Sequence, residues 1–216
     1  MKVTTKKYDE RLKVDLTTFV EKIEPLSQYN GGEYGPGVVD YTLTKAEYTN
    51  RYIPAYTVSK THGEKVVTAY SQLLDNVPFN NVLDLGCGDG EILNYIKKQK
   101  EDVDVYGCTI HLGEVRVAKE NYGIDLVGAD MRLMDEYFVP KSLDLVISNA
   151  ALHFLNEEDQ LKTVAAIRNV LKDDGRFFVV HYHDDAHHTV EDFPGFKAVR
   201  PDWINFLGPI FLYEKS

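Results

Sequence analysis

The chain has 216 residues, of which 44% are hydrophobic and 27% are charged, and its formal net charge is −10. This length suits one α/β domain with some residues left over, and the composition is ordinary for a globular protein. An acidic balance without a basic patch argues against nucleic acid as a partner, because phosphate binding depends on basic surfaces.

The two cysteines, Cys87 and Cys108, are too few for a disulfide framework and indicate a reducing compartment. The charged first residues, MKVTTKKYDERLK, precede no long apolar run, so we expect no signal peptide. No stretch approaches the roughly 18 apolar residues of a membrane span. We therefore expect a cytoplasmic protein with no membrane partner, as a monomer or a homodimer.

The predicted elements begin irregularly. Residues 29–41, YNGGEYGPGVVDY, have the Gly, Tyr and Pro content of a loop, and TKAE at 44–47 matches a helix capping box. Apolar residues at helical spacing predict a helix over 64–77.

Strands and helices alternate from residue 81 onward. The spacing predicts strands at 81–85, 103–110, 124–130, 143–150 and 175–183, and helices at 90–99, 114–123 and 157–172. This alternation predicts a parallel sheet covered by helices. The tail predicts two more strands, within 195–206 and 209–216, antiparallel across a tight turn at Gly208–Pro209. The expected fold is a doubly wound, seven-stranded α/β sheet, mostly parallel with an antiparallel last strand.

Polar residues collect where the predicted strands end. In an open α/β sheet, ligands bind beyond the carboxyl ends of the strands, so five such ends describe a single crevice. The polar groups are Asp84 through Gly90, Thr109 and His111, Asp130, Asn149 and His153, and His181 through Asp185.

The stretch VLDLGCGDGEIL, residues 82–93, runs from a buried strand through a carboxylate into alternating glycines. Glycine there lets a ligand approach the backbone closely. Gly86, Gly88 and Gly90 are each two apart, unlike the G-x-G-x-x-G turn that holds a pyrophosphate. The stretch resembles motif I of the class I S-adenosylmethionine (SAM)-dependent methyltransferases, and the order of elements extends this resemblance over about residues 60–216.

The resemblance implies SAM as cofactor, S-adenosylhomocysteine as product and a small-molecule methyl acceptor. It gives Asp84 the ammonium group, the glycine backbone the methionine and ribose portions, and Asp130 with the Met131 amide the adenine. The cofactor-binding residues that it implies are Asp84, Gly86, Cys87, Gly88, Thr109, Ile110, Asp130, Met131 and Asn149.

One position departs from the family pattern. The second strand usually ends in an acidic residue that binds both ribose hydroxyls, whereas Thr109 stands here. A similar Thr occurs in the branch that resembles the cyclopropane fatty acid synthases. The substitution of Thr109 then either lowers the affinity for the ribose, or Glu114 or a water supplies the missing acceptor.

Three histidines are candidate catalytic residues. His153 follows the fourth strand and is the first candidate for a general base, with His181 and His183 as reserves. His153 as a capping or orienting residue, and 181–188 as a solvated loop, are the alternatives. HYHDDAHH also suggests a metal site, but a strand–loop run does not guarantee three or four converging ligands, so we expect no metal.

The resemblance divides the chain into an N-terminal helical and loop segment, residues 1–58, and a SAM-binding Rossmann-like domain, residues 59–216. The first segment is predicted to form a lid in which Tyr41, Arg51 and Tyr52 contact the substrate, or else to pack as helix residues. Methyl transfer to an oxygen or nitrogen atom is the favoured function. A SAM-using enzyme of other chemistry and an inactive SAM-binding module are the alternatives.

Overall fold

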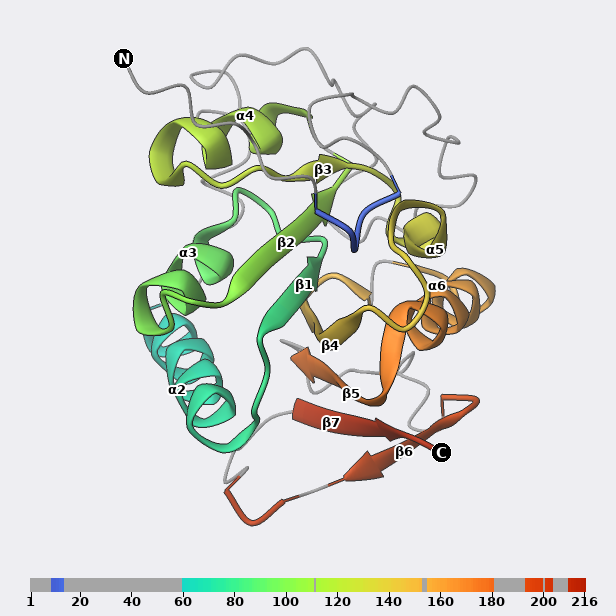
Figure 1. Cartoon of the computed structure of the whole chain (residues 1–216). Coiled ribbons are helices and arrows are strands. Elements are labelled where there is room, and N and C mark those ends of the chain that lie inside the picture. The colour runs from blue at the N-terminus through green and yellow to red at the C-terminus, as the bar shows by residue number, and fades with distance from the viewer. Residues whose placement is uncertain are drawn as a thin grey trace.

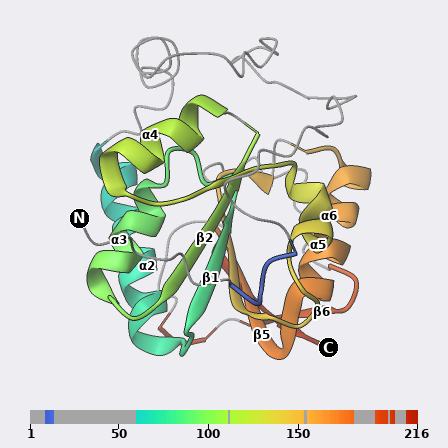
Figure 2. The ribbon, with the colours of Figure 1, turned by 45° about the horizontal axis from the view of Figure 1, so that its top comes forward.

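The computed structural model describes residues 9–13, 60–110, 112–152, 155–180, 193–199, 201–203 and 210–216. Within them, a seven-stranded sheet in the order β3-β2-β1-β4-β5-β7-β6 has helices on both faces (Figures 1 and 2). Strands β1 to β5 pair in parallel, and β7 is antiparallel to both β5 and β6. The predicted doubly wound, mostly parallel sheet with an antiparallel last strand is confirmed.

The elements have the following bounds. The strands are β1 (Asn81–Leu85), β2 (Asp104–Thr109), β3 (Val127–Gly128), β4 (Leu143–Asn149), β5 (Leu171–Val180), β6 (Phe196–Val199) and β7 (Ile210–Lys215). The helices are α2 (Lys60–Asn76), α3 (Glu91–Gln99), α4 (Leu112–Tyr122), the short 3-10 helix η1 (Met131–Leu133), α5 (Met134–Tyr137) and α6 (Glu157–Val170).

Several predicted boundaries were wrong, among them the start of the helix predicted over 64–77, which begins at Lys60 as α2, and the end of the helix predicted over 157–172, which ends at Val170 as α6. Strand β3 has two residues instead of the seven expected over 124–130, because it lies at the sheet edge and pairs with β2 alone. Strand β6 ends at Val199 rather than continuing to 206, and Pro201 beyond it has no N–H for a ladder hydrogen bond. Strand β5 begins at Leu171, directly after α6. The tight turn at 208–209 and the capping box at 44–47 lie outside the described residues.

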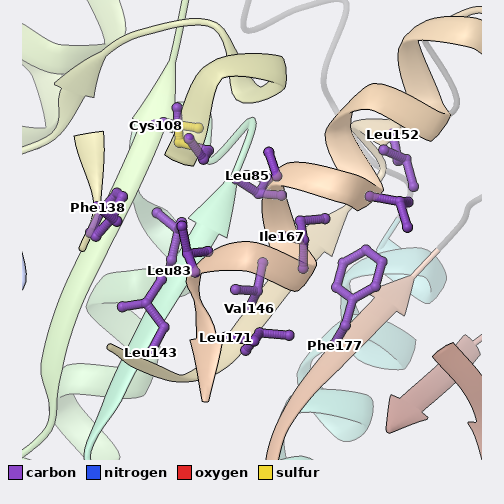
Figure 3. Packing of buried hydrophobic residues seen from close by; sticks show 14 of the residues in the cluster. Leu83, Leu85, Cys108, Phe138, Leu143, Val146, Leu152, Ile167, Leu171 and Phe177 are labelled. Carbon is purple, nitrogen blue, oxygen red and sulfur yellow. The ribbon is translucent and has the colours of Figure 1, made fainter. Parts of the chain in front are cut away.

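Alternating side chains of the central strands fill two separate cores. Leu83, Val146 and Phe177 point to the face covered by α5 and α6, as Figure 3 shows. Val82 and Ile147 point to the opposite face, which α2 and α3 cover. Both faces of a parallel sheet must be covered in this way, which explains why most side chains of its central strands are apolar, with the polar ones near the strand ends.

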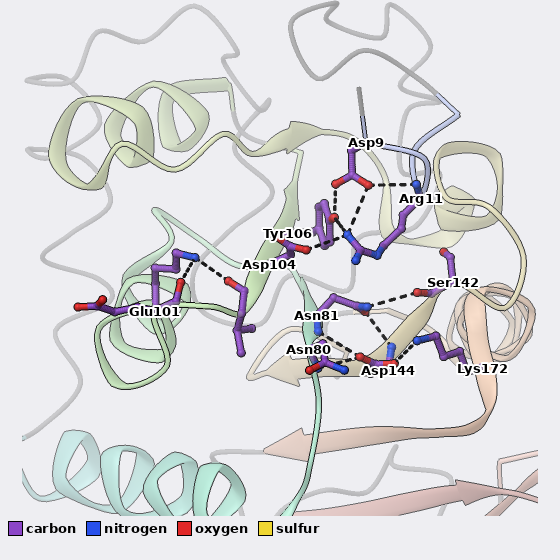
Figure 4. A network of polar contacts seen from close by, with 12 residues as sticks. Asp9, Arg11, Asn80, Asn81, Glu101, Asp104, Tyr106, Ser142, Asp144 and Lys172 are labelled. Atoms are coloured by element: carbon purple, nitrogen blue, oxygen red, sulfur yellow. Dashed lines mark hydrogen bonds and ion pairs between the residues drawn. The ribbon is translucent and has the colours of Figure 1, made fainter. Parts of the chain in front are cut away.

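A polar network joins β1, β4 and β5 at their amino ends (Figure 4). One Asp144 carboxylate oxygen accepts the amide N–H of Asn80 at 2.8 Å and of Asn81 at 3.2 Å. The Asn81 side chain accepts the Asp144 amide at 2.8 Å in return, and the Lys172 ammonium donates to Asp144 at 2.5 Å. Burial opposes ionisation of Asp144, but these donors, Lys172 foremost, outweigh it and lower its pKa.

Residues 9–13 belong to the body of the domain. Arg11 donates to Asp104 at 2.8 Å and to the Tyr106 hydroxyl at 3.0 Å, while that hydroxyl donates to Asp9 (Figure 4). Leu12 forms an antiparallel bridge with Phe138 and is buried in the core of the α5 and α6 face. Part of the predicted segment 1–58 therefore packs on β2 and on the end of α5.

The Asp144 network generates a stability prediction. Asp144→Asn should lower the free energy of unfolding at pH 7 by about 1–3 kcal/mol, because hydrogen bonds to a charged acceptor are replaced by weaker ones. The folded-state pKa of Asp144 is lowered, so its contribution is present above the ordinary carboxyl pKa and is lost as the pH falls. The difference between wild type and variant should therefore shrink towards pH 3, as measured by urea unfolding. Asp173→Asn is the control, since Asp173 is 76% exposed in its pair with Lys141, and its stability should match wild type. Equal losses in the two variants would contradict the assignment.

Candidate functional site

The carboxyl ends of β1 to β4 hold the predicted cofactor-binding residues at one edge of the sheet. Parallel pairing sets Leu85 beside Cys108 and Thr109 beside Gly128, so the segments that follow these strands are neighbours. The predicted catalytic and substrate-contacting residues lie outside the described residues, and their roles stay predictions. They are His153, His181, His183, Tyr41, Arg51 and Tyr52.

Asp84 is a buried carboxylate near the end of the central strand. Its side chain belongs to a residue that is 1% exposed, and neither carboxylate oxygen has a hydrogen-bond partner among the described residues. Burial raises its pKa well above the ordinary carboxyl value. Buried polar groups are nearly always paired, so this unpaired carboxylate indicates a place for a cationic ligand group.

The glycine turn beside Asp84 is bare and partly open. Gly86, Gly88 and Gly90 have φ of 68°, 55° and 83°, the left-handed region that side chains rarely adopt. A Cβ on Gly86 would lie 2.5 Å from the Ala151 Cβ and 3.2 Å from the Met131 methyl. A Cβ on Gly88 would meet no atom of the described residues within 4 Å. The described residues therefore close around Gly86 and leave space above Gly88.

Cys87 stabilises the turn through its backbone, and its thiol is not activated. Its amide donates to the Cys108 carbonyl at 3.0 Å, and its own carbonyl accepts the Gly90 amide at 3.0 Å. Burial raises the pKa of the Cys87 thiol well above its ordinary value, so the thiol stays neutral. The backbone hydrogen bonds of Cys87 are thus used inside the protein, where they hold the turn against β2.

A carboxylate stands at the end of β2, supplied by the next helix. The Thr109 hydroxyl donates to the side chain of Glu114, which lies in the first turn of α4. Both residues are buried, at 4% exposure each. The sequence left open whether Glu114 takes the place of the acidic residue that the family has at this position. In the structure, the Glu114 carboxylate is within hydrogen-bond reach of Thr109.

Asp130 carries an ion pair that sequence reasoning missed. Its carboxylate accepts the Arg132 amide at 2.9 Å, which caps η1, and also faces the Arg132 guanidinium, with a shortest contact of 2.5 Å. A second guanidinium nitrogen donates to Asp159 of α6 at 3.0 Å. The D-x-R spacing after a strand is the local signal for the first contact. No sequence pattern near Arg132 indicates its contact with Asp159.

The segment after β4 is held over the turn in a strained conformation. Asn149 ends β4 and is half-buried, and Ala150 has φ of 50°. For a residue with a Cβ this costs about 1–2 kcal/mol, and such strain is typical of functional sites. The Ala150 amide donates to the Val180 carbonyl at 2.8 Å, and Ala151 then sits against Gly86. The segment that the sequence predicts to line the site is therefore fixed close to the glycines.

The other hollows of the described residues lie along α6, and Arg132 and Leu133 line one of them. Two hollows of about 650 and 500 Å³ flank α6, and none of the predicted cofactor-binding residues lines either of them. In the described part of the chain, no three His, Cys, Asp or Glu residues are grouped so that they could hold a metal, and 181–188 lies outside it. Among the described helices, none has the length and apolar character needed to cross a membrane.

Comparison with known sequences identifies the central part of the chain. Residues 82–175 match the model of a family described as a methyltransferase domain. An uncharacterized methyltransferase of Schizosaccharomyces pombe is 32% identical over 101 residues, which cover 45% of this chain and 38% of that protein. The chain spans about a third to a half of the length of the curated relatives that it matches, since the matches cover 34% to 53% of their lengths.

Two solved structures share the fold. The PH0226 protein of Pyrococcus horikoshii superposes with a TM-score of 0.62 at 18% identity, covering 79% of this chain and 99% of that one. A TehB-like SAM-dependent methyltransferase of Corynebacterium glutamicum superposes with a TM-score of 0.57 at 21% identity, covering 80% and 98%.

The buried carboxylate of Asp84 predicts an unusual pH dependence of stability. Because its folded-state pKa is raised, the folded protein keeps a proton that the unfolded chain releases. Stability should therefore fall as the pH rises above the ordinary carboxyl pKa, by up to about 1.4 kcal/mol per pH unit, until the folded-state pKa is passed. Asp84→Asn removes this loss, so its free energy of unfolding should exceed that of wild type by a margin that grows between pH 4 and pH 7.

Urea unfolding of the protein without ligand measures this margin. Asp102→Asn, at an exposed carboxylate, is the control and should show no such trend. A margin for Asp84→Asn that is constant or shrinks with pH would mean that Asp84 has a partner.

Proposed function

Because the chain carries a methyltransferase domain with the class I, Rossmann-like fold, we propose that it transfers a methyl group from SAM to an oxygen or nitrogen atom of a small molecule. One observation carries the proposal. The unpaired carboxylate of Asp84 lies beside a glycine turn with open space above Gly88, at the ligand-binding edge of the sheet.

The residues at this edge fit the groups of SAM. Its ammonium suits Asp84, which accepts from it directly or through a water and is thereby stabilised in the ionised form. The open face of Gly88 accommodates the methionine and ribose portions without a side chain in the way.

The nucleoside end fits the next two strand ends. Thr109 and Glu114 together offer a hydroxyl and a carboxylate to the ribose hydroxyls, which replaces the single acidic residue of the family pattern. Asp130 offers an acceptor for the adenine amino group, with Met131 beside it against Gly86. We assign Ile110 and Asn149 to the same site, as flanking residues of β2 and β4.

When bound, SAM supplies a methyl group that is already electrophilic. The task left to the chain is alignment of the acceptor, which alone can supply about 7–11 kcal/mol of the barrier. We assign His153 as the base for acceptors that lose a proton, with His181 and His183 as reserves, and Tyr41, Arg51 and Tyr52 to the acceptor. The net charge of −10 favours a small molecule over nucleic acid.

The first test is transfer itself. With SAM labelled in its methyl group and a panel of small hydroxyl- and amine-bearing acceptors, label should appear in an acceptor while S-adenosylhomocysteine accumulates. Calorimetry should show that S-adenosylhomocysteine binds the full chain. Absence of binding at millimolar concentration would contradict the proposal, and sulfur products other than S-adenosylhomocysteine would indicate a different SAM chemistry.

The second test uses two glycines that share a backbone conformation. Gly88 and Gly123 both have positive φ, and an added Cβ on either would meet no atom of the described residues within 4 Å, but Gly88 is half-buried whereas Gly123 is exposed and follows α4 away from the site. Gly88→Ala and Gly123→Ala should therefore destabilise the fold similarly, by about 1–2 kcal/mol. Only Gly88→Ala should weaken S-adenosylhomocysteine binding, by roughly tenfold or more, because its methyl group occupies the ligand's space. Equal affinities in the two variants would show that the space above Gly88 is not the binding site.

A further inference from the structure

Asp84 lies in a part of the domain where an ionised carboxylate is poorly stabilised. The residue is 1% exposed, and neither of its carboxylate oxygens has a hydrogen-bond partner among the described residues. Burial alone accounts for its raised pKa, with no charged group acting against it. A carboxylate that is buried without a partner takes up a proton rather than keep its charge. The protein without ligand therefore holds Asp84 as a neutral acid.

The groups around Asp84 that the structure describes offer it no positive charge. Gly107 of β2 and Ile147 of β4 flank it, and Ile147 belongs to the core under α2 and α3. The ionisable side chains of that core are Tyr70, Tyr95, Tyr122 and Cys87. Burial raises the pKa of the Cys87 and Cys108 thiols, and the charge of Asp84 raises it further, while Glu114 in the first turn of α4 acts on Cys87 in the same direction. Tyrosine and cysteine are neutral near pH 7 and an ionised glutamate is negative, so none of these groups favours an ionised Asp84.

Asp89 is the other carboxylate of the glycine turn, and its surroundings differ. The residue is half-buried, and its Oδ1 accepts the Glu91 amide at 3.3 Å. Burial raises the pKa of Asp89, but the backbone N–H groups of Glu91 and of Asp89 itself oppose this effect. Asp89 therefore has donors that stabilise its charge, whereas Asp84 has none among the described residues. The turn thus contains two acids that allow a matched comparison.

We propose that Asp84 holds a proton in the free protein and releases it on receiving the ammonium group of SAM, so that binding of the cofactor is coupled to the loss of one proton. This inference rests on the proposed function. The carboxylic acid of Asp84 and the ligand ammonium become a carboxylate–ammonium pair, and the proton passes to water. Affinity should therefore rise with pH by up to about tenfold per unit, until Asp84 ionises without ligand. S-adenosylhomocysteine carries the same ammonium, so its affinity should rise with that of SAM.

Calorimetry on the full chain counts the released protons directly. Titration at pH 6 in buffers of different ionisation enthalpy gives the number of protons released per ligand, and the amino group of S-adenosylhomocysteine stays protonated at this pH. The second probe is 5′-methylthioadenosine, which keeps the nucleoside and the sulfur but has no ammonium. Wild type should release about one proton more with S-adenosylhomocysteine than with 5′-methylthioadenosine. Its affinity for S-adenosylhomocysteine should rise roughly tenfold from pH 5.5 to pH 6.5.

Two variants assign the proton to one residue, because the seven histidines also titrate in this range. Asp84→Asn should release about one proton fewer than wild type with S-adenosylhomocysteine, and the rise in affinity with pH should be lost. Asp89→Asn keeps Asp84 and should release as many protons as wild type. If wild type releases equal numbers with both probes, or if Asp84→Asn releases as many protons as wild type, the inference fails. If wild type does not bind S-adenosylhomocysteine, it is the proposed function that fails.

Discussion

A buried carboxylate that has no hydrogen-bond partner among the described residues is the constraint around which this site is organised. Asp84 sits at the end of the central strand, where water is excluded by the helices on its face of the sheet. Two cores and an amino-end polar network stabilise the sheet enough to tolerate that carboxylate. Burial of Asp84 destabilises the protein without ligand. The same burial strengthens ligand binding, because water does not screen the interaction between Asp84 and a cationic group of the ligand.

The acidic groups at three neighbouring strand ends differ in the partners that the protein gives them. Asp84 has no partner among the described residues, Glu114 accepts a hydroxyl from Thr109, and Asp130 is neutralised by Arg132. The extent to which the described residues satisfy the acidic group therefore increases from β1 to β3. In the proposed site, the cation of the ligand would meet the first of these groups, its hydroxyls the second and its neutral amine the third.

The fold could be predicted because its signal is local and periodic. Each central strand is apolar on both faces, and the Asn156 cap of α6 stands directly before an acidic first turn. The errors have equally physical origins. Strand β3 is short because a sheet edge offers one partner, and η1 and α5 carry too few residues for a helical period to show.

The site could be predicted only as far as it is contiguous with strand ends. The place of Asp84, Thr109 and Asp130 at strand ends could be predicted because each stands in or after an apolar run, and their role in binding stays a prediction. The pairing of Arg132 with Asp159 spans 27 positions and that of Arg11 with Asp104 spans 93, so no sequence window contains them. The sequence could give Glu114 as one candidate for the acceptor near Thr109. It could not decide in its favour, because the distance between the two residues depends on where α4 begins.

The contact between the segment after β4 and the glycine turn also limits which substitutions the two segments can accept. A Cβ at position 86 would fall 2.5 Å from that of Ala151, so the two positions share room for a single methyl group. The residue at one position therefore determines which substitutions the other can accept, although the two are 65 residues apart in the sequence. Sequence change in the segment after β4 must therefore proceed at its other positions, while 86 and 151 change only as a pair.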